Sequence, residues 1–376
     1  MTDRTNGAEG GHDVLSDPFQ LLGSGVNQRR LAIERLRDSH NLRVRPGLMF
    51  RSIASRTPGP CPLLTDARRS WSYTLNGKVH LVANSWPVMR IVRAEHLGMC
   101  FGVRDAIALA LEQARAGPLT ILGDLVHNET VMASLQARGI AVAHEAAQVK
   151  TPTVMVTAHG ASARTLANTR ALGLAVVEAT CPLVHTAHRA ITALAGDGYH
   201  PVIIGQRAHV EVRGLTEDLS DCDVVLDEAD VLALDEHPRI GIAAQTTQSI
   251  ERVRHLVALI QQRFPRSDVR FIDTVCLPTK QRQHAALELA RQSDIVIVIG
   301  GANSNNTREL VSTCRRYCSD VHHIQTELDL RAAWFRATST VGLTAGTSTP
   351  DHVITRIEQR IGQLAATWGL PAERGR

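Results

Sequence analysis

The sequence is poor in aromatic residues, which make up only 3% of its 376 positions. A surface that stacks nucleic-acid bases depends on aromatic side chains, so such a surface is not expected. No apolar run approaches the roughly 20 residues that a membrane-spanning helix needs. The first residues carry Asp3, Glu9 and Asp13 and no apolar core, which argues against a secretory signal. These absences predict a cytoplasmic globular protein.

Close cysteine pairs are also missing. Seven cysteines, an odd number without a C-x-x-C pair, do not indicate a disulfide framework or a typical zinc finger. Gly300-Gly301 follows an apolar run but lacks the G-x-G-x-x-G spacing, and no GK[ST] motif is present. The net charge of +4 suits a site for a small anion better than a nucleic-acid-binding face.

The first 88 residues differ from the rest of the chain. They contain Gly-, Pro- and Ser-rich stretches such as Ser55 to Pro62, and a regular strand-to-helix pattern begins only at about Met89. We predict an N-terminal extension over residues 1–88, partly disordered, that carries no chemistry. Three units follow, at residues 89–170, 171–266 and 267–376, the last with a C-terminal tail.

An internal repeat defines these three units. In each, an apolar strand leads to a cysteine and then to a helix with apolar residues at helical spacing; the strands are 91–93, 175–177 and 269–272, and the cysteines are Cys100, Cys181 and Cys276. A second strand ends in glycine and a polar loop, and a third ends in a small, hydroxyl-rich turn. The first polar residue of the second loop follows the cysteine by 27, 28 and 28 positions, at His127, His209 and Ser304.

Alternating strands and helices of this kind predict an α/β fold of three lobes related by a pseudo-threefold axis. Ligands of parallel sheets bind beyond the carboxyl ends of the strands. All of these loops follow strand carboxyl ends. Three lobes that close around one axis would therefore bring the three cysteines and a ring of polar side chains to one point.

A single cysteine after a buried strand is most often a small core residue. Three at equivalent positions of a repeat indicate a shared soft-metal centre, either zinc or an iron–sulfur cluster. A cubane cluster can accept one cysteine from each lobe, which leaves its fourth iron open as a Lewis acid. Cys314 and Cys318 lie outside the repeat, and we interpret them as packing residues.

Polar side chains in the strand-end loops predict a binding pocket for a phosphate or diphosphate. Its donors would be His127, His159, His209, Ser304, Asn306 and Ser348. Glu211 is the carboxylate of this set. A buried glutamate has a raised pKa and could deliver a proton, and the Thr246 hydroxyl could orient the substrate or relay that proton.

In sequence order these motifs resemble the 4-hydroxy-3-methylbut-2-enyl diphosphate reductase family of LytB-type enzymes, from about Met89 to near Gln363. The motifs are Gly98-Met99-Cys100-Phe101-Gly102-Val103, Val126-His127-Asn128, Ala158-His159-Gly160, Ala179-Thr180-Cys181-Pro182-Leu183-Val184, His209-Val210-Glu211-Val212-Arg213-Gly214, Gln245-Thr246-Thr247, Asp273 to Cys276, Asn303-Ser304-Asn305-Asn306 and Thr344-Ala345-Gly346-Thr347-Ser348-Thr349-Pro350-Asp351.

The resemblance implies one [4Fe–4S] cluster per chain, held by Cys100, Cys181 and Cys276, with the substrate hydroxyl at the open iron. It implies that the histidines, Thr246 and the polar residues of the last unit hold the diphosphate; these residues are His127, His159, His209, Ser304, Asn305, Asn306 and Ser348. Glu211, helped by Thr246, would protonate the leaving hydroxyl. Ferredoxin or flavodoxin would supply two electrons, and the products would be isopentenyl and dimethylallyl diphosphate.

The sequence departs from the usual family pattern at several positions. The family usually has Pro-Arg-Gly-Phe-Cys-Ala-Gly around the first cysteine, whereas this chain has His96-Leu97-Gly98-Met99-Cys100-Phe101-Gly102. Where the family usually has His-Pro-Glu, this chain has His209-Val210-Glu211. Asn305 stands at a position where the family usually has serine. Two alternatives stay open on the sequence. One is an iron–sulfur hydro-lyase acting on another small anion, and the other is a non-catalytic iron–sulfur sensor.

Overall fold

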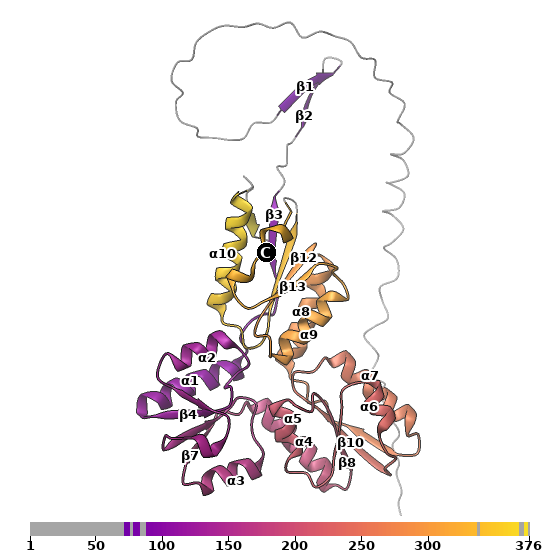
Figure 1. Ribbon diagram of the computed structural model, residues 1–376. Helices are drawn as coiled ribbons and strands as arrows, with labels where there is room; N and C mark the ends of the chain where they lie inside the picture. Colours follow the sequence, from indigo (N-terminus) through magenta and orange to yellow (C-terminus); the bar gives the residue numbers. More distant parts are fainter. Residues whose placement is uncertain (1–70, 76–77, 83–87, 337–338, 368–371, 375–376) are drawn as a thin grey trace, which may run out of the picture. The chain divides into compact units, whose positions relative to one another are not determined.

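A computed structural model describes residues 71–75, 78–82, 88–336, 339–367 and 372–374. Most of the predicted N-terminal extension lies outside the described residues. Within it, β1 (Trp71–Leu75) and β2 (Lys78–Val82) pair as an antiparallel hairpin. The rest of the described chain forms three parallel sheets with helices, as the repeat predicted (Figure 1).

The first sheet has the strand order β5-β4-β6-β7, and all of its neighbouring strands are parallel. Its strands are β4 (Leu119–Leu122), β5 (Ala141–Ala143), β6 (Thr153–Val156) and β7 (Ala175–Glu178). The helices of this lobe are α1 (Phe101–Ala116), α2 (Glu129–Gln136) and α3 (Ala163–Ala171), with a short 3₁₀ turn at Ala146–Gln148.

The second sheet has the equivalent order β11-β10-β8-β9, again fully parallel. Its strands are β8 (His200–Ile204), β9 (Asp223–Val225), β10 (Arg239–Ala244) and β11 (Asp268–Phe271). The helices are α4 (Pro182–Gly196), α5 (Val210–Thr216), α6 (Glu228–Ala233) and α7 (Ile250–Arg263).

The third sheet has five parallel strands in the order β13-β12-β14-β3-β15. Its strands are β3 (Met89–Arg93), β12 (Ile295–Ile299), β13 (Val321–Ile324), β14 (Thr340–Ala345) and β15 (Ala372–Arg374). The helices are α8 (Leu277–Arg291), α9 (Asn305–Arg315) and α10 (Asp351–Thr367), with 3₁₀ turns at Glu327–Asp329 and Ala332–Trp334.

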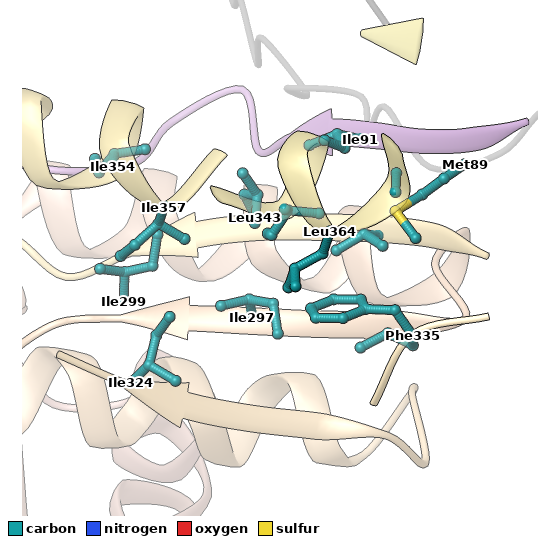
Figure 2. Packing of buried hydrophobic residues seen from close by; sticks show 14 of the residues in the cluster. Met89, Ile91, Ile297, Ile299, Ile324, Phe335, Leu343, Ile354, Ile357 and Leu364 are labelled. Carbon is teal, nitrogen blue, oxygen red and sulfur yellow. The ribbon is translucent and has the colours of Figure 1, made fainter. Parts of the chain in front are cut away.

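The core of the third lobe shows why its strands are nearly uniformly apolar. Ile297 and Leu343, on adjacent strands, are both fully buried, and Ile357 of α10 packs against this face of the sheet (Figure 2). Parallel sheets are covered on both faces, so their strands are continuous apolar runs rather than alternating ones. Burying each of these side chains contributes roughly 1.5–3 kcal/mol.

The strand before each cysteine belongs to the preceding lobe in a cyclic order. β3 precedes the first sheet in the chain but pairs with β14 of the third sheet, β7 pairs with β6 of the first, and β11 pairs with β10 of the second. Figure 1 shows the indigo β3 among the orange and yellow elements of the third lobe. The helix after each cysteine packs on the next sheet: α1 on β4, α4 on β8 and β10, α8 on β12 and β14. The lobe limits expected at residues 170/171 and 266/267 therefore separate β7 and β11 from the sheets to which they are hydrogen-bonded.

This crossing explains the position of the cysteines. Each one lies in the segment that leaves one sheet and enters the helix of the next lobe, so each cysteine stands at a junction between two lobes. Strand pairing across the junction ties the lobes together in a closed cycle. The three crossings are equivalent, as a pseudo-threefold arrangement requires.

Candidate active site

Each of the three cysteines caps a helix in the same way. Cys100, Cys181 and Cys276 are the N-cap residues of α1, α4 and α8, and none of them makes a side-chain cap hydrogen bond. Their backbone N–H groups donate to carbonyl oxygens of the three hydroxyl-rich turns: Cys100 to Thr347 at 2.9 Å, Cys181 to Ala158 at 3.1 Å and Cys276 to Thr246 at 3.0 Å. The sulfur atoms therefore lie at positive helix ends, which favour thiolates.

The three sulfur atoms approach one another at the junction of the lobes. A Cβ atom added to Gly102 would lie 2.5 Å from the Cys181 Sγ atom, so only glycine fits after Cys100-Phe101. Burial, with smaller contributions from the charges of Glu211 and Cys100, raises the pKa of Cys276 to about 11, although a hydrogen bond with the Thr279 hydroxyl acts in the opposite direction. The charge of Cys100 also contributes to the raised pKa of Cys181, so the three thiols interact, and a cation between them would favour their thiolate forms.

Three soft sulfur donors can hold either a zinc ion or an iron–sulfur cluster. Thiolates about 2.3 Å from one tetrahedral ion lie less than about 4 Å apart. Among the described residues, the sets of three ligand atoms within 4.8 Å of one another are two histidine-containing sets, and the three cysteines do not form such a set. The three sulfur atoms are therefore not gathered around one ion-sized point, and the chemistry of three cysteine donors is compatible with an iron–sulfur cluster.

Three histidines from the ends of β4, β6 and β8 form a compact group. The rings of His127 and His159 stack with their centroids 4.4 Å apart, and the His209 ring meets their edges at 5.2 and 5.3 Å. Burial, together with the charges of His127, Arg308 and Arg213, lowers the pKa of His209 to about 3. Burial and the two other imidazoles hold the pKa of His159 well below its usual value. The rings are therefore neutral at physiological pH.

Two ring nitrogens of this group lack a partner among the described residues. His127 Nδ1 and His159 Nε2 are buried without a hydrogen-bond partner among the described residues, and the closest carboxylate oxygen, on Asp124, is 4.0 Å from His127 Nδ1. His209 Nδ1 accepts the backbone N–H of Glu211 at 3.1 Å, so the proton of the neutral ring is on Nε2. Buried polar atoms without partners indicate a site that a ligand completes.

The loops of the third lobe add polar groups to this site. Ser348 Oγ donates to the carbonyl oxygen of His127 at 3.2 Å and so links the third lobe to the first. Asn306 Oδ1 accepts the Thr347 N–H at 3.0 Å, which leaves its Nδ2 without a partner among the described residues. Ser304 caps α9 by accepting the Thr307 N–H, so the positive end of this helix faces the same junction.

Asn305 has a different position from its neighbours. Its Nδ2 donates to the Thr247 carbonyl oxygen at 3.0 Å, and this contact joins the third lobe to the second. Its Oδ1 is buried without a partner among the described residues. The predicted binding residue is therefore partly engaged in holding two lobes together.

Glu211 and Thr246 form one hydrogen-bonded unit. The Glu211 carboxyl is 1% exposed and accepts the Thr246 backbone N–H at 2.6 Å and the Thr246 hydroxyl at 3.1 Å. Burial raises the pKa of Glu211 to about 7, although both hydrogen bonds from Thr246 act in the opposite direction. The Glu211 charge also contributes to the raised pKa of the Cys181 thiol, after burial as the main cause. A carboxyl with this pKa beside the thiols can store and release a proton at neutral pH.

A cavity of about 620 Å³ opens beside the histidines, between the first and second lobes. His127 and His209 line it, whereas none of the three cysteines and not Glu211 do. Arg308, which sequence reasoning missed, also lines it and donates to Gln206 Oε1 at 2.9 Å. Its charge lowers the pKa of both His127 and His209. In the sequence, the feature that could have pointed to Arg308 is its position three residues after Asn305, one turn into the helix that follows the polar loop.

Cys314 and Cys318 are packing residues, as expected. Both are buried against α8 and β12 in one apolar cluster, and their sulfur atoms contact backbone carbonyl oxygens at 3.5–3.8 Å. Cys222 is half-buried, and Cys61 lies outside the described residues. In the part of the chain that the structure describes, we found no helix with the length and apolarity to cross a membrane.

Comparisons with known proteins lead to one family. The family model described as LytB protein matches residues 91–362. The 4-hydroxy-3-methylbut-2-enyl diphosphate reductase of Pelobacter propionicus is 36% identical over 278 residues, which are 73% of this chain and 99% of that protein. The Aquifex aeolicus enzyme of the same name is 35% identical over 73% of this chain and 96% of that protein.

Solved structures lead to the same family. A structure of (E)-4-hydroxy-3-methyl-but-2-enyl diphosphate reductase, the terminal enzyme of the non-mevalonate pathway, matches with a TM-score of 0.55 and 35% identity, over 73% of this chain and all of that one. The Plasmodium falciparum reductase shares the fold, with a TM-score of 0.70 and 24% identity over 77% of this chain and 92% of that one. The chain belongs to the LytB protein family.

Proposed function

We propose that this protein reduces 4-hydroxy-3-methylbut-2-enyl diphosphate to isopentenyl and dimethylallyl diphosphate, with release of the hydroxyl as water. The observation that carries the proposal is the meeting of three helix-capping cysteines, three neutral histidines and the buried Glu211–Thr246 pair at one junction. The reaction consumes two electrons and two protons for each water released.

The metal centre that fits the cysteine set is one [4Fe–4S] cluster per chain, held by Cys100, Cys181 and Cys276. Three cysteines are enough for a cubane if one iron stays free of protein ligands. Such a cluster supplies electrons one at a time and a Lewis-acidic iron. The origin of one cysteine from each junction between two lobes, each at the N-terminus of a helix, supports this choice.

The diphosphate would occupy the group of donors around the histidines. His127, His159 and His209 can each donate from a neutral ring, Asn306 offers a free Nδ2, and the N-terminus of α9 adds backbone N–H groups. Ser304, Asn305, Ser348 and Thr246 complete the set, and Arg308 contributes positive charge from the wall of the cavity. Neutral donors avoid the repulsion that three adjacent imidazolium groups would create.

Glu211 would deliver the proton that turns the substrate hydroxyl into water. Its pKa of about 7 means that a substantial fraction carries the proton at physiological pH. The Thr246 hydroxyl, 3.1 Å from the Glu211 Oε2 atom, can pass that proton on or orient the substrate hydroxyl. Burial keeps bulk water from competing for the same proton.

Ferredoxin or flavodoxin would deliver the two electrons, and a reducing cytoplasm would be the working compartment. Seven cysteines, an odd number, argue against a disulfide framework and so favour a reducing environment.

An anaerobic assay tests the proposal directly. The full chain is reconstituted with iron and sulfide, and product formation from 4-hydroxy-3-methylbut-2-enyl diphosphate is followed with reduced viologen as the electron source. We expect both product diphosphates, with strict dependence on the reductant. Turnover without reductant would indicate a hydro-lyase, and no product despite an intact cluster in absorption and EPR spectra would falsify the reductase proposal.

A further inference from the structure

Arg282 is a buried guanidinium on α8, the helix that Cys276 caps. It lies six residues after that cysteine, on the second turn of the helix, and is 8% exposed. Arginine is almost never this buried unless a carboxylate is paired with it. Among the described residues, however, Arg282 forms no ion pair with an acidic side chain, and all of its hydrogen bonds go to backbone carbonyl oxygens.

The hydrogen bonds of Arg282 join α8 to the segment that leads to Cys100. Its Nε and Nη2 atoms donate to the Gly98 carbonyl oxygen at 2.9 and 2.7 Å, and its Nη1 atom donates to the Pro278 carbonyl oxygen at 2.9 Å. Gly98 has a φ of 75°, in the left-handed region that favours glycine. The guanidinium therefore holds the backbone two residues before one proposed ligand, and it stands on the helix that follows another.

The negative groups that act on Arg282 are two of the proposed ligands themselves. Burial lowers the pKa of Arg282, the charges of the Cys100 and Cys276 thiolates act in the opposite direction, and the charge of Arg104 adds a further lowering. An arginine guanidinium nevertheless stays charged in proteins. A buried charge is costly unless a charge of opposite sign compensates it. The thiolates at the junction are thus the compensating charges for which this buried cation is placed.

A cluster at the three cysteines would add to this need for a cation. Three thiolates carry three negative charges, and an oxidised cubane core carries two positive ones, so the sum is negative. Each electron that is added makes this sum more negative by one charge. The reduction potential of such a centre depends on the net charge and the polarity around it, so a buried positive charge nearby affects the reduced state most.

We propose that Arg282 raises the reduction potential of the metal centre, because it holds one positive charge beside two of the three ligands and no carboxylate cancels it. This inference rests on the cluster of the proposed function and not on the identity of the substrate. Arg282 acts as a positioning residue, since its contacts are with the backbone near the ligands. Its charge stabilises the reduced state more than the oxidised state, and burial reduces the screening of this interaction by water.

The test measures the potential of the cluster-loaded full chain, anaerobically and without substrate. A dye-mediated redox titration, followed by EPR, gives the ratio of reduced to oxidised cluster at each potential. Arg282→Gln removes the charge but keeps an amide that donates hydrogen bonds. At a fixed potential we expect this ratio to fall at least tenfold, which corresponds to a downward shift of about 59 mV for one electron.

Arg282→Lys separates the charge from the two parallel hydrogen bonds to the Gly98 carbonyl oxygen. Lysine keeps a positive charge but lacks the planar fork that makes both bonds. On the acid side of neutrality, where the amine holds its proton, the ratio should stay within threefold of the wild type. Equal falls in the glutamine and lysine variants would overturn the proposal, because the hydrogen bonds and not the charge would then set the potential.

Iron per chain shows whether each variant still assembles its metal centre. Arg282→Met, which keeps an unbranched stem and loses the charged head, is the second neutral variant if the glutamine variant takes up too little iron. If neither neutral variant takes up iron, the lysine variant decides. Full iron with lysine supports a requirement for positive charge, whereas iron loss in all three variants overturns the proposal.

The matched control removes an exposed arginine from the same helix. Arg291 lies near the end of α8, 3.0 Å from the Glu288 carboxylate, so solvent screens its charge. Arg291→Gln should change the ratio of reduced to oxidised cluster less than twofold. An equal fall in this variant would contradict a specific role for the buried charge.

The readout is independent of the proposed activity. If the potential falls in Arg282→Gln but the wild type forms no product from the diphosphate, the reductase function fails and the role of Arg282 stands. If the wild type forms both products and the potential of Arg282→Gln equals that of the wild type, the function stands and the role of Arg282 fails.

Discussion

The interior of the third lobe and the junction between the lobes are both buried, but they are built from opposite materials. In the interior, Ile297, Leu343 and Ile357 are fully buried and fill space without polar atoms (Figure 2). At the junction, Glu211 is 1% exposed with a raised pKa, and His159 has a buried nitrogen without a partner among the described residues. Burial of the interior side chains stabilises the folded protein, whereas the buried polar groups of the junction destabilise it but are arranged to bind a ligand.

The largest effect is expected from the thiols of the junction. Replacing Cys181 by serine removes one of three soft ligands, so we expect loss of most bound iron and of measurable turnover. Iron per chain after anaerobic reconstitution measures the effect. Cys314→Ser, in a buried packing cysteine, is the matched control and should retain its iron. Equal iron loss in both variants would show that the ligands were chosen wrongly.

Glu211→Gln should lower turnover by about 10²–10⁴, the range expected for loss of a general acid. Glutamine keeps the size of the side chain and can still accept the Thr246 N–H, so iron content should be unchanged. In the wild type, proton delivery should fall as the pH rises through about 7, because the carboxyl then loses its proton. Turnover over the pH range with reduced viologen is the measurement, and an unchanged rate in the variant would contradict the proton-donor role.

Substitutions in the interior of the third lobe should lower stability and leave turnover nearly unchanged, the opposite of substitutions at the junction. Ile297→Ala removes buried methyl groups from the middle of β12 and leaves a cavity, so we expect a loss of about 2–5 kcal/mol in stability. The thermal unfolding midpoint of the cluster-loaded protein should fall, while kcat/KM measured well below that midpoint stays within twofold. A large drop in kcat/KM would mean that the interior and the junction are coupled.

The junction should also gain stability when its buried charge is removed. The pKa of Glu211 is about 7 in the folded protein and 4.5 in its ordinary state, so the folded protein binds the extra proton between these values. Its stability contribution is therefore complete below pH 4.5 and is lost as the pH rises through 7. The Glu211→Gln variant should not show this loss of stability, which is on the order of 3 kcal/mol. The variant should therefore unfold at a higher temperature than the wild type at pH 8. A lower midpoint at pH 8 would contradict this sign.

The smallest effect is expected at the edge of the junction. Arg308 is exposed, so its attraction for a diphosphate is screened, and Arg308→Gln should raise KM about three- to tenfold with kcat unchanged. The increase should shrink at high salt. Arg291→Gln, on an exposed ion pair with Glu288, is the control and should leave KM unchanged. A drop in kcat alone would place Arg308 in a different role.

Much of the fold followed from local pattern. The helices predicted after the three cysteines are confirmed as α1, α4 and α8, and each begins directly after its cysteine. Prolines at the first turns of α4 and α8 mark these starts because proline is tolerated there. The three parallel sheets are also confirmed.

The sequence by itself determined the repeat, the residue types at each strand end and the family, because these depend on spacing and identity along the chain. Only the tertiary structure decided which sheet receives β3, β7 and β11, because strand pairing depends on partners far away in the sequence. It also decided the pairing of Glu211 with Thr246, the approach of Arg308 to the histidines and the exposure of Phe101. Burial and distance, which set these properties, have no local signature in sequence.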